Sequence, residues 1–103
     1  MLKYKTIDKE FSLEVLLQGD LDIEGTEVIT DSLLPQLLKS QVVNLNFSEV
    51  PFVDSSGMGL LISLIDTLKE NNIEVTISNI GKDVNEVFDL LQIKEIIGNK
   101  IFI

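Results

Sequence analysis

The residues best suited to chemistry lie in one short segment, FVDSSGMGL, at positions 52–60. This segment places two hydroxyls, those of Ser55 and Ser56, directly after the carboxylate of Asp54. A serine at the start of a helix commonly accepts a hydrogen bond from a free amide of the first turn, so helix capping by Ser55 is the simplest interpretation. The alternative is that the Ser55 hydroxyl carries a phosphate, which the free amides and partial positive charge of a helix N-terminus stabilise.

Gly57 and Gly59 favour the second interpretation. Each glycine costs a helix about 1 kcal/mol relative to alanine, so something other than helix formation must require small side chains there. The close approach of another backbone segment or of a phosphate is one such requirement, and missing side chains also let a kinase active site reach the hydroxyl. Met58 lies between the glycines, where a flexible thioether suits an adaptable interface, so we count it as a partner-binding residue if it is exposed.

The composition excludes several classes of chemistry. The 103 residues include no cysteine and no histidine, which removes thiol nucleophiles, Cys/His zinc sites and Ser-His-Asp triads. A net charge of −9 disfavours nucleic acids and anionic membranes as partners. No apolar run approaches the roughly twenty residues that span a bilayer, and the first residues lack a signal-peptide core. We therefore expect a single domain over residues 1–103, cytoplasmic, monomeric in isolation, without catalytic activity, cofactor or metal.

Hydrophobic periodicity predicts the elements that position this segment. Alternation at period two and apolar stripes at helical spacing predict strands over residues 4–7, 11–18, 41–47, 74–80 and 100–103, and helices over 24–39, 57–69 and 82–91. Pro35 predicts a kink in the first helix, or a break with Asp31 or Ser32 starting a second short helix. The order of elements predicts an α/β fold: a mixed, mostly parallel sheet of four to five strands, with an N-terminal antiparallel hairpin and helices packed on the sheet.

Several segments, in the right order, resemble the STAS family, and in particular its anti-sigma factor antagonists. FVDSSGMGLLISL resembles the phosphorylation-site signature of that family, in which an Asp-Ser-Ser/Thr-Gly-x-Gly run opens a helix. LQGDLDIEGTEVI is similar to the family's segment after the second strand, and VVNLNFSEVPFVDSSG to its third strand and the loop that follows. KDVNEVFDLLQIKEII is similar to its C-terminal helix, so the resemblance covers nearly the whole chain.

The resemblance implies a cycle of partner exchange. In such antagonists the dephosphorylated form binds an anti-sigma factor that is also a serine kinase, and so releases a sigma factor; phosphorylation ends this binding and a separate serine phosphatase restores it. Carried over by position, the acceptor is Ser55, with Asp54 before it and Ser56 after it. Asp22, with Asp20 as a further candidate, would line the same surface from the loop after the second strand.

Two rival interpretations remain. Asp20, Asp22 and Asp54, with Lys100, are similar to the aspartyl-phosphate site of a magnesium-dependent receiver domain. The order of elements argues against a receiver, because the acidic pair of such a site follows the first strand of an all-parallel sheet. The second rival is a STAS-type scaffold or nucleotide-sensing module that no kinase controls, and the sequence leaves it open.

Overall fold

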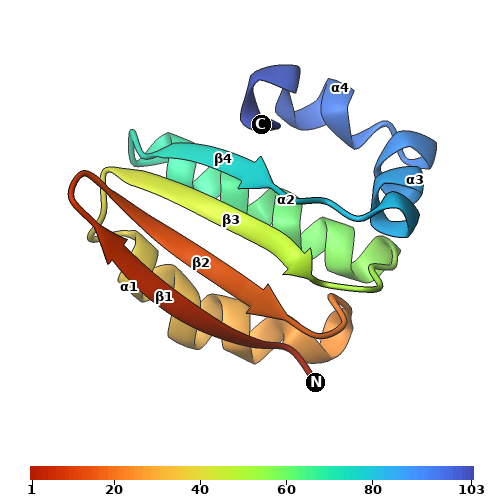
Figure 1. The fold of residues 1–103 in the computed structure, drawn as a ribbon, viewed down its shortest axis with the longest axis horizontal. Coiled ribbons are helices and arrows are strands. Elements are labelled where there is room, and N and C mark those ends of the chain that lie inside the picture. The colour runs from red at the N-terminus through yellow and green to blue at the C-terminus, as the bar shows by residue number, and fades with distance from the viewer.

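The computed structural model describes all 103 residues and contains one four-stranded mixed sheet (Figure 1). The strands are β1 (Lys3–Lys9), β2 (Ser12–Gln18), β3 (Val42–Glu49) and β4 (Glu74–Ser78), and they lie in the order β1-β2-β3-β4. β1 and β2 form an antiparallel hairpin, whereas β2 pairs with β3, and β3 with β4, in parallel. The predicted α/β fold with a mixed sheet and an N-terminal hairpin is confirmed, and its strand number is four.

Buried and partly exposed side chains alternate along the central strands, so that one face of the sheet packs against the core. In β2, buried Leu13, Val15 and Leu17 alternate with partly exposed residues, and β3 repeats the pattern. Successive side chains of a strand point to opposite faces, so these positions share one face. They join a single cluster of 26 buried apolar residues that contains no charged or polar side chain.

The helices that contribute to the core come from the connections between strands and from the segment after β4. They are the 3-10 helix η1 (Ile23–Gly25), the π-helix η2 (Val28–Leu33), α1 (Leu34–Leu37), α2 (Ser55–Glu70), α3 (Lys82–Leu90), α4 (Ile93–Ile97) and the 3-10 helix η3 (Asn99–Ile101). In Figure 1, α1 and α2 lie behind the sheet, and α3 and α4 follow on the side of β4. α2 contributes a buried stripe that includes Leu61, Ile65 and Leu68.

The helical segment before Pro35 is a π-helix rather than an α-helix. The amide of Leu34 donates to the carbonyl of Ile29, five residues earlier, so the backbone before the proline forms a π-turn. Pro35 then falls at the start of α1, where a missing amide donor costs little. The predicted break at Asp31 or Ser32 is wrong: Leu33 and Leu34 are both right-handed helical, and η2 runs directly into α1, so the proline is accommodated by the π-turn without interrupting the helical segment.

The C-terminal segment differs from its prediction. A strand was expected over residues 100–103, but residues 99–101 form η3, and only an isolated parallel bridge links Phe102 to Ile77 of β4. The helix α4 was not predicted as a separate element. Gln92, with φ of 55°, ends α3 in the left-handed region, after which Ile93 and Ile97 anchor one further turn in the core.

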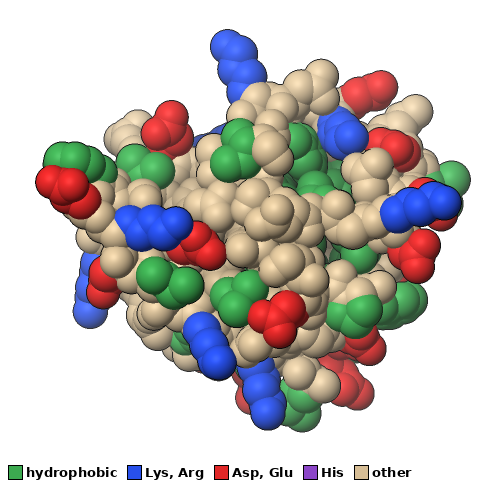
Figure 2. Space-filling view, in the orientation of Figure 1, with side chains coloured by type: hydrophobic (Ala, Val, Ile, Leu, Met, Phe, Trp, Pro, Cys, Tyr) green, Lys and Arg blue, Asp and Glu red, His purple; other side chains and the backbone are tan.

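No helix covers the second face of the sheet, and Figure 2 shows charged side chains interspersed with hydrophobic ones on this side of the molecule. Hydrogen bonds between neighbouring strands order it: the Asn44 Nδ2 donates to the Thr76 Oγ1 at 2.9 Å, and the Asn46 Nδ2 donates to the Glu14 Oε2 at 3.2 Å. The Lys9 Nζ lies 2.8 Å from the Glu14 Oε1. The hydrogen bonds from Lys9 and then from Asn46 lower the pKa of the Glu14 carboxyl from its ordinary value of 4.5.

We predict that Glu14 contributes stability that acid removes. Because the folded state lowers its pKa, the contribution is present above the ordinary value and is lost as the pH falls below it. Glu14→Gln should lower the free energy of unfolding at pH 7 by about 0.5–1 kcal/mol, since Lys9 is largely exposed, and by much less near about pH 3. Urea unfolding at both pH values measures this, with Glu10→Gln in the exposed hairpin turn as control. An equal loss at both pH values would contradict it.

Candidate functional site

Two loops meet at the N-terminus of α2. The loop after β2 and the loop between β3 and α2 run side by side, and a parallel bridge pairs Leu21 with Val53. The Leu21 amide donates to the Phe52 carbonyl at 3.0 Å, and the Asp54 amide donates to the Leu21 carbonyl at 3.3 Å. The first loop is therefore fixed to the segment that leads into Ser55.

The pairing determines which side chains face outward. Leu21 and Val53 are both buried, so their neighbours along each extended segment point away from the core. On one segment these neighbours are Asp20 and Asp22, and on the other they include Asp54. The structure thus brings the loop of Asp20 and Asp22 beside the segment of Asp54, and Asp20 is exposed.

Asp54, and not Ser55, caps α2. The Asp54 Oδ1 accepts from the Gly57 amide at 2.8 Å, and the Asp54 carbonyl accepts from the Met58 amide at 2.9 Å. Asp54 has an extended backbone, whereas Ser55 is the first helical residue. The prediction that Ser55 is the N-cap is therefore wrong by one position: Asp and Ser are about equally good caps, and the extended backbone of Asp54 places its carboxylate, not the Ser55 hydroxyl, at the first-turn amides. Capping by Asp54 leaves the Ser55 side chain exposed and its hydroxyl unused.

The two glycines have different environments. A Cβ added to Gly57 would lie 1.9 Å from the Leu21 carbonyl oxygen and 2.5 Å from its carbon. The expected close approach of another backbone is thus confirmed at Gly57, and it is the loop after β2 that approaches. A Cβ on Gly59 would meet nothing within 4 Å. Gly59 follows Ser55 by four residues, so the two share one exposed face of α2.

Met58 belongs to the core. Its side chain is only 2% exposed, so the expectation that it contacts a partner is wrong. The spacing of Met58, Leu61, Ile65 and Leu68 places all four on the buried stripe of α2, and this spacing was the signal in the sequence that identifies Met58 as a core residue.

The arrangement suits the reversible attachment of an anion. The first-turn amides of Ser55 and Ser56 have no partner within the helix, and the 16-residue α2 adds partial positive charge at this end. Both serine side chains are exposed and can reach a second protein. Asp54 caps this end, and the adjoining loop carries Asp20 and Asp22, so a phosphate would be stabilised locally while the surface became more negative.

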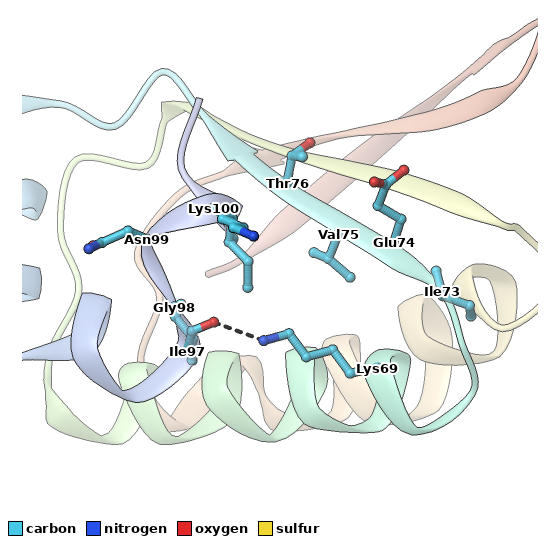
Figure 3. Close-up of a pocket in the computed structure, with 10 residues that line it drawn as sticks. Lys69, Ile73, Glu74, Val75, Thr76, Ile97, Gly98, Asn99 and Lys100 are labelled. Atoms are coloured by element: carbon cyan, nitrogen blue, oxygen red, sulfur yellow. Dashed lines mark hydrogen bonds between the residues drawn. The ribbon is translucent and has the colours of Figure 1, made fainter.

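The most voluminous pocket lies at the other end of α2. It measures about 570 Å³ between the C-terminal end of α2, β4 and the C-terminal segment, and Lys69, Val75 and Lys100 are among its lining residues (Figure 3). The Lys69 Nζ donates to the Ile97 carbonyl at 2.8 Å and so ties α4 to α2. Lys69 and Asp54 lie at opposite ends of α2, about 22 Å apart along its axis.

This placement removes the receiver alternative. A receiver site requires its lysine beside the phosphorylated aspartate, but Lys100 lines the pocket at the far end of α2 from Asp54. Nor do Asp20, Asp22 and Asp54 come together as a group that could hold a metal ion.

Comparison with known proteins identifies the family. The model of a family described as the STAS domain matches residues 4–102. The chain belongs to the STAS domain family. No helix of this STAS domain is both long and apolar enough to cross a membrane.

The relatives of this STAS domain include proteins named as anti-sigma factor antagonists. It is 25% identical over 96 residues to the anti-sigma-B factor antagonist of Staphylococcus epidermidis, covering 92% of this chain and 89% of the relative. Its fold matches SpoIIAA, a Bacillus cell fate determinant, in the phosphorylated form, with a TM-score of 0.69 at 18% identity over 98% of this chain and 89% of the other. The match to the anti-sigma factor antagonist SpoIIAA in its unphosphorylated form has a TM-score of 0.65 at 21% identity, over 85% and 83%.

Two exposed apolar side chains beside the site were not predicted from the sequence. Phe52 is 50% exposed and Ile23 is 64% exposed. Consecutive residues of an extended segment point to opposite sides, so the pair Phe52-Val53 could not be buried together. The position of Phe52 next to Val53 could therefore have indicated that Phe52 is exposed. The exposure of Ile23 depends on the turn η1, which no pattern in the sequence predicts.

Proposed function

We propose that this STAS domain is an anti-sigma factor antagonist. In its unphosphorylated form it binds an anti-sigma factor with serine kinase activity and thereby releases a sigma factor. Phosphorylation of Ser55 ends this binding, and a separate serine phosphatase restores it in the cytoplasm. The observation that carries the proposal is the exposed Ser55 hydroxyl, left free by the Asp54 cap, beside the loop of Asp20 and Asp22. The names of the relatives support it.

Charge explains how the phosphate acts. A phosphoserine adds nearly two negative charges at pH 7 to a chain whose net charge is −9. The new charge lies at a docking surface that already carries three carboxylates, so it makes contact with a partner unfavourable through repulsion and desolvation. The fold need not rearrange, because the first turn of α2 offers free amides to the phosphate.

Phosphate mapping tests the acceptor. The experiment incubates the full chain with ATP and the kinase-type anti-sigma factor of the same organism, then locates phosphate by mass spectrometry. We expect one phosphate on Ser55, none on the Ser55→Ala variant, and normal labelling of Ser56→Ala, which is the matched control because Ser56 is also exposed. An unlabelled wild-type chain, or labelling of Ser56 alone, would contradict the proposal and favour a scaffold without kinase control.

A further inference from the structure

Phe52 and Ile23 are held in fixed positions at the border of the site. The Phe52 carbonyl accepts the Leu21 amide, which fixes the backbone of the loop before α2. Ile23 begins η1, where the Asp22 Oδ1 accepts the Glu24 amide at 3.0 Å and the Thr26 Oγ1 donates to the Ile23 carbonyl at 2.6 Å. Apolar side chains that are exposed on an ordered backbone lose little conformational freedom on binding.

Acidic residues flank these two side chains along the two paired loops. Asp22 and Glu24 flank Ile23 along the chain, and Asp54 follows Phe52 by two residues. Asp20 and Asp22 lie on the segment paired with the segment of Phe52. The two paired loops therefore present exposed apolar side chains next to carboxylates, and the complement of such a surface is an apolar recess bordered by basic groups.

We propose that Phe52 and Ile23 are the apolar anchors with which this STAS domain docks on the anti-sigma factor kinase, an inference that rests on the proposed function. Buried aromatic and aliphatic anchors supply most of the affinity of an interface, and the contacts around them exclude water. Such a water-excluded contact cannot accommodate a phosphate dianion next to it without a large desolvation cost. Docking through these anchors would therefore make the binding sensitive to phosphate on Ser55.

Truncation of the anchors tests the inference. Isothermal titration calorimetry would measure the affinity of the unphosphorylated full chain for the kinase-type anti-sigma factor of its own organism. We expect Phe52→Ala and Ile23→Ala each to weaken binding about tenfold or more, and Phe52→Leu to recover most of the loss. Phe11→Ala is the control, because Phe11 is 82% exposed in the hairpin turn. Urea unfolding of each variant establishes that its fold is retained.

The outcomes separate the two proposals. If the wild type binds and both alanine variants bind as tightly as Phe11→Ala, the anchoring role of Phe52 and Ile23 is refuted while the proposed function stands. If the wild type does not bind the kinase, the proposed function is refuted, and the inference about Phe52 and Ile23, which rests on it, is refuted as well. Weaker binding by the two variants, with Phe11→Ala unchanged, supports the inference.

Discussion

Replacement of Gly57 by alanine is expected to lower the free energy of unfolding by about 2–3 kcal/mol, toward the upper end of the cost of overpacking. The added Cβ would lie 1.9 Å from the Leu21 carbonyl oxygen, and both groups belong to backbone that is fixed by hydrogen bonds. Relief of the clash must displace either the first turn of α2 or the loop of Asp20 and Asp22. Urea unfolding at pH 7 measures the loss.

Gly59→Ala is the matched control, and the expected change has the opposite sign. Its Cβ would point into open space, so alanine should raise the free energy of unfolding by about 1 kcal/mol through its better helix propensity. Equal effects of the two substitutions would refute the assignment of Gly57 to close packing. If Gly59→Ala stabilises the fold but slows phosphorylation of Ser55, the space above Gly59 is needed by the kinase.

Phosphorylation of Ser55 is expected to weaken binding to the anti-sigma factor kinase at least about 100-fold, which corresponds to about 2.7 kcal/mol. The loss comes from two added charges on a surface that includes Asp20, Asp22 and Asp54. Calorimetric titration of the kinase with the phosphorylated and unphosphorylated chain, both verified by mass spectrometry, measures it.

Substitutions at the same position separate charge from size. Ser55→Ala should bind about as tightly as the unphosphorylated wild type, and Ser55→Asp should bind with an intermediate affinity because it adds one charge without the phosphate volume. The loss of affinity caused by phosphorylation should become smaller as salt is added, since exposed charges are screened within about 10 Å at 0.1 M. An affinity for the kinase that phosphorylation leaves unchanged would refute the switch.

The sheet and α2 were predictable because burial there is one-sided. Alternation in 11–18 corresponds to β2, and the apolar stripe in 57–69 corresponds to α2, which also includes Ser55 and Ser56. In both elements a single face packs on the core, so the pattern of apolar residues directly reports the period of the backbone. The loop after β2 was placed beside the site through the family resemblance, and the Leu21–Val53 bridge fixes it there.

Other features depend on contacts that a pattern does not specify. Asp54 and Ser55 are both good capping residues, and only the geometry of the turn selects Asp54. The glycines look alike in the sequence, yet their environments differ. The Leu21 carbonyl leaves no room for a side chain at Gly57, whereas no atom of the chain lies within 4 Å of a Cβ at Gly59. The C-terminal residues form η3 rather than a strand, because only Phe102 pairs with β4.

Release of a sigma factor is the most direct test of the central claim. A fluorescently labelled sigma factor, bound to its anti-sigma factor kinase, would be titrated with this STAS domain while fluorescence anisotropy reports the bound fraction. The unphosphorylated chain is expected to release the sigma factor, and the chain phosphorylated on Ser55 is expected to leave it bound. Release by both forms, or by neither, would contradict the account.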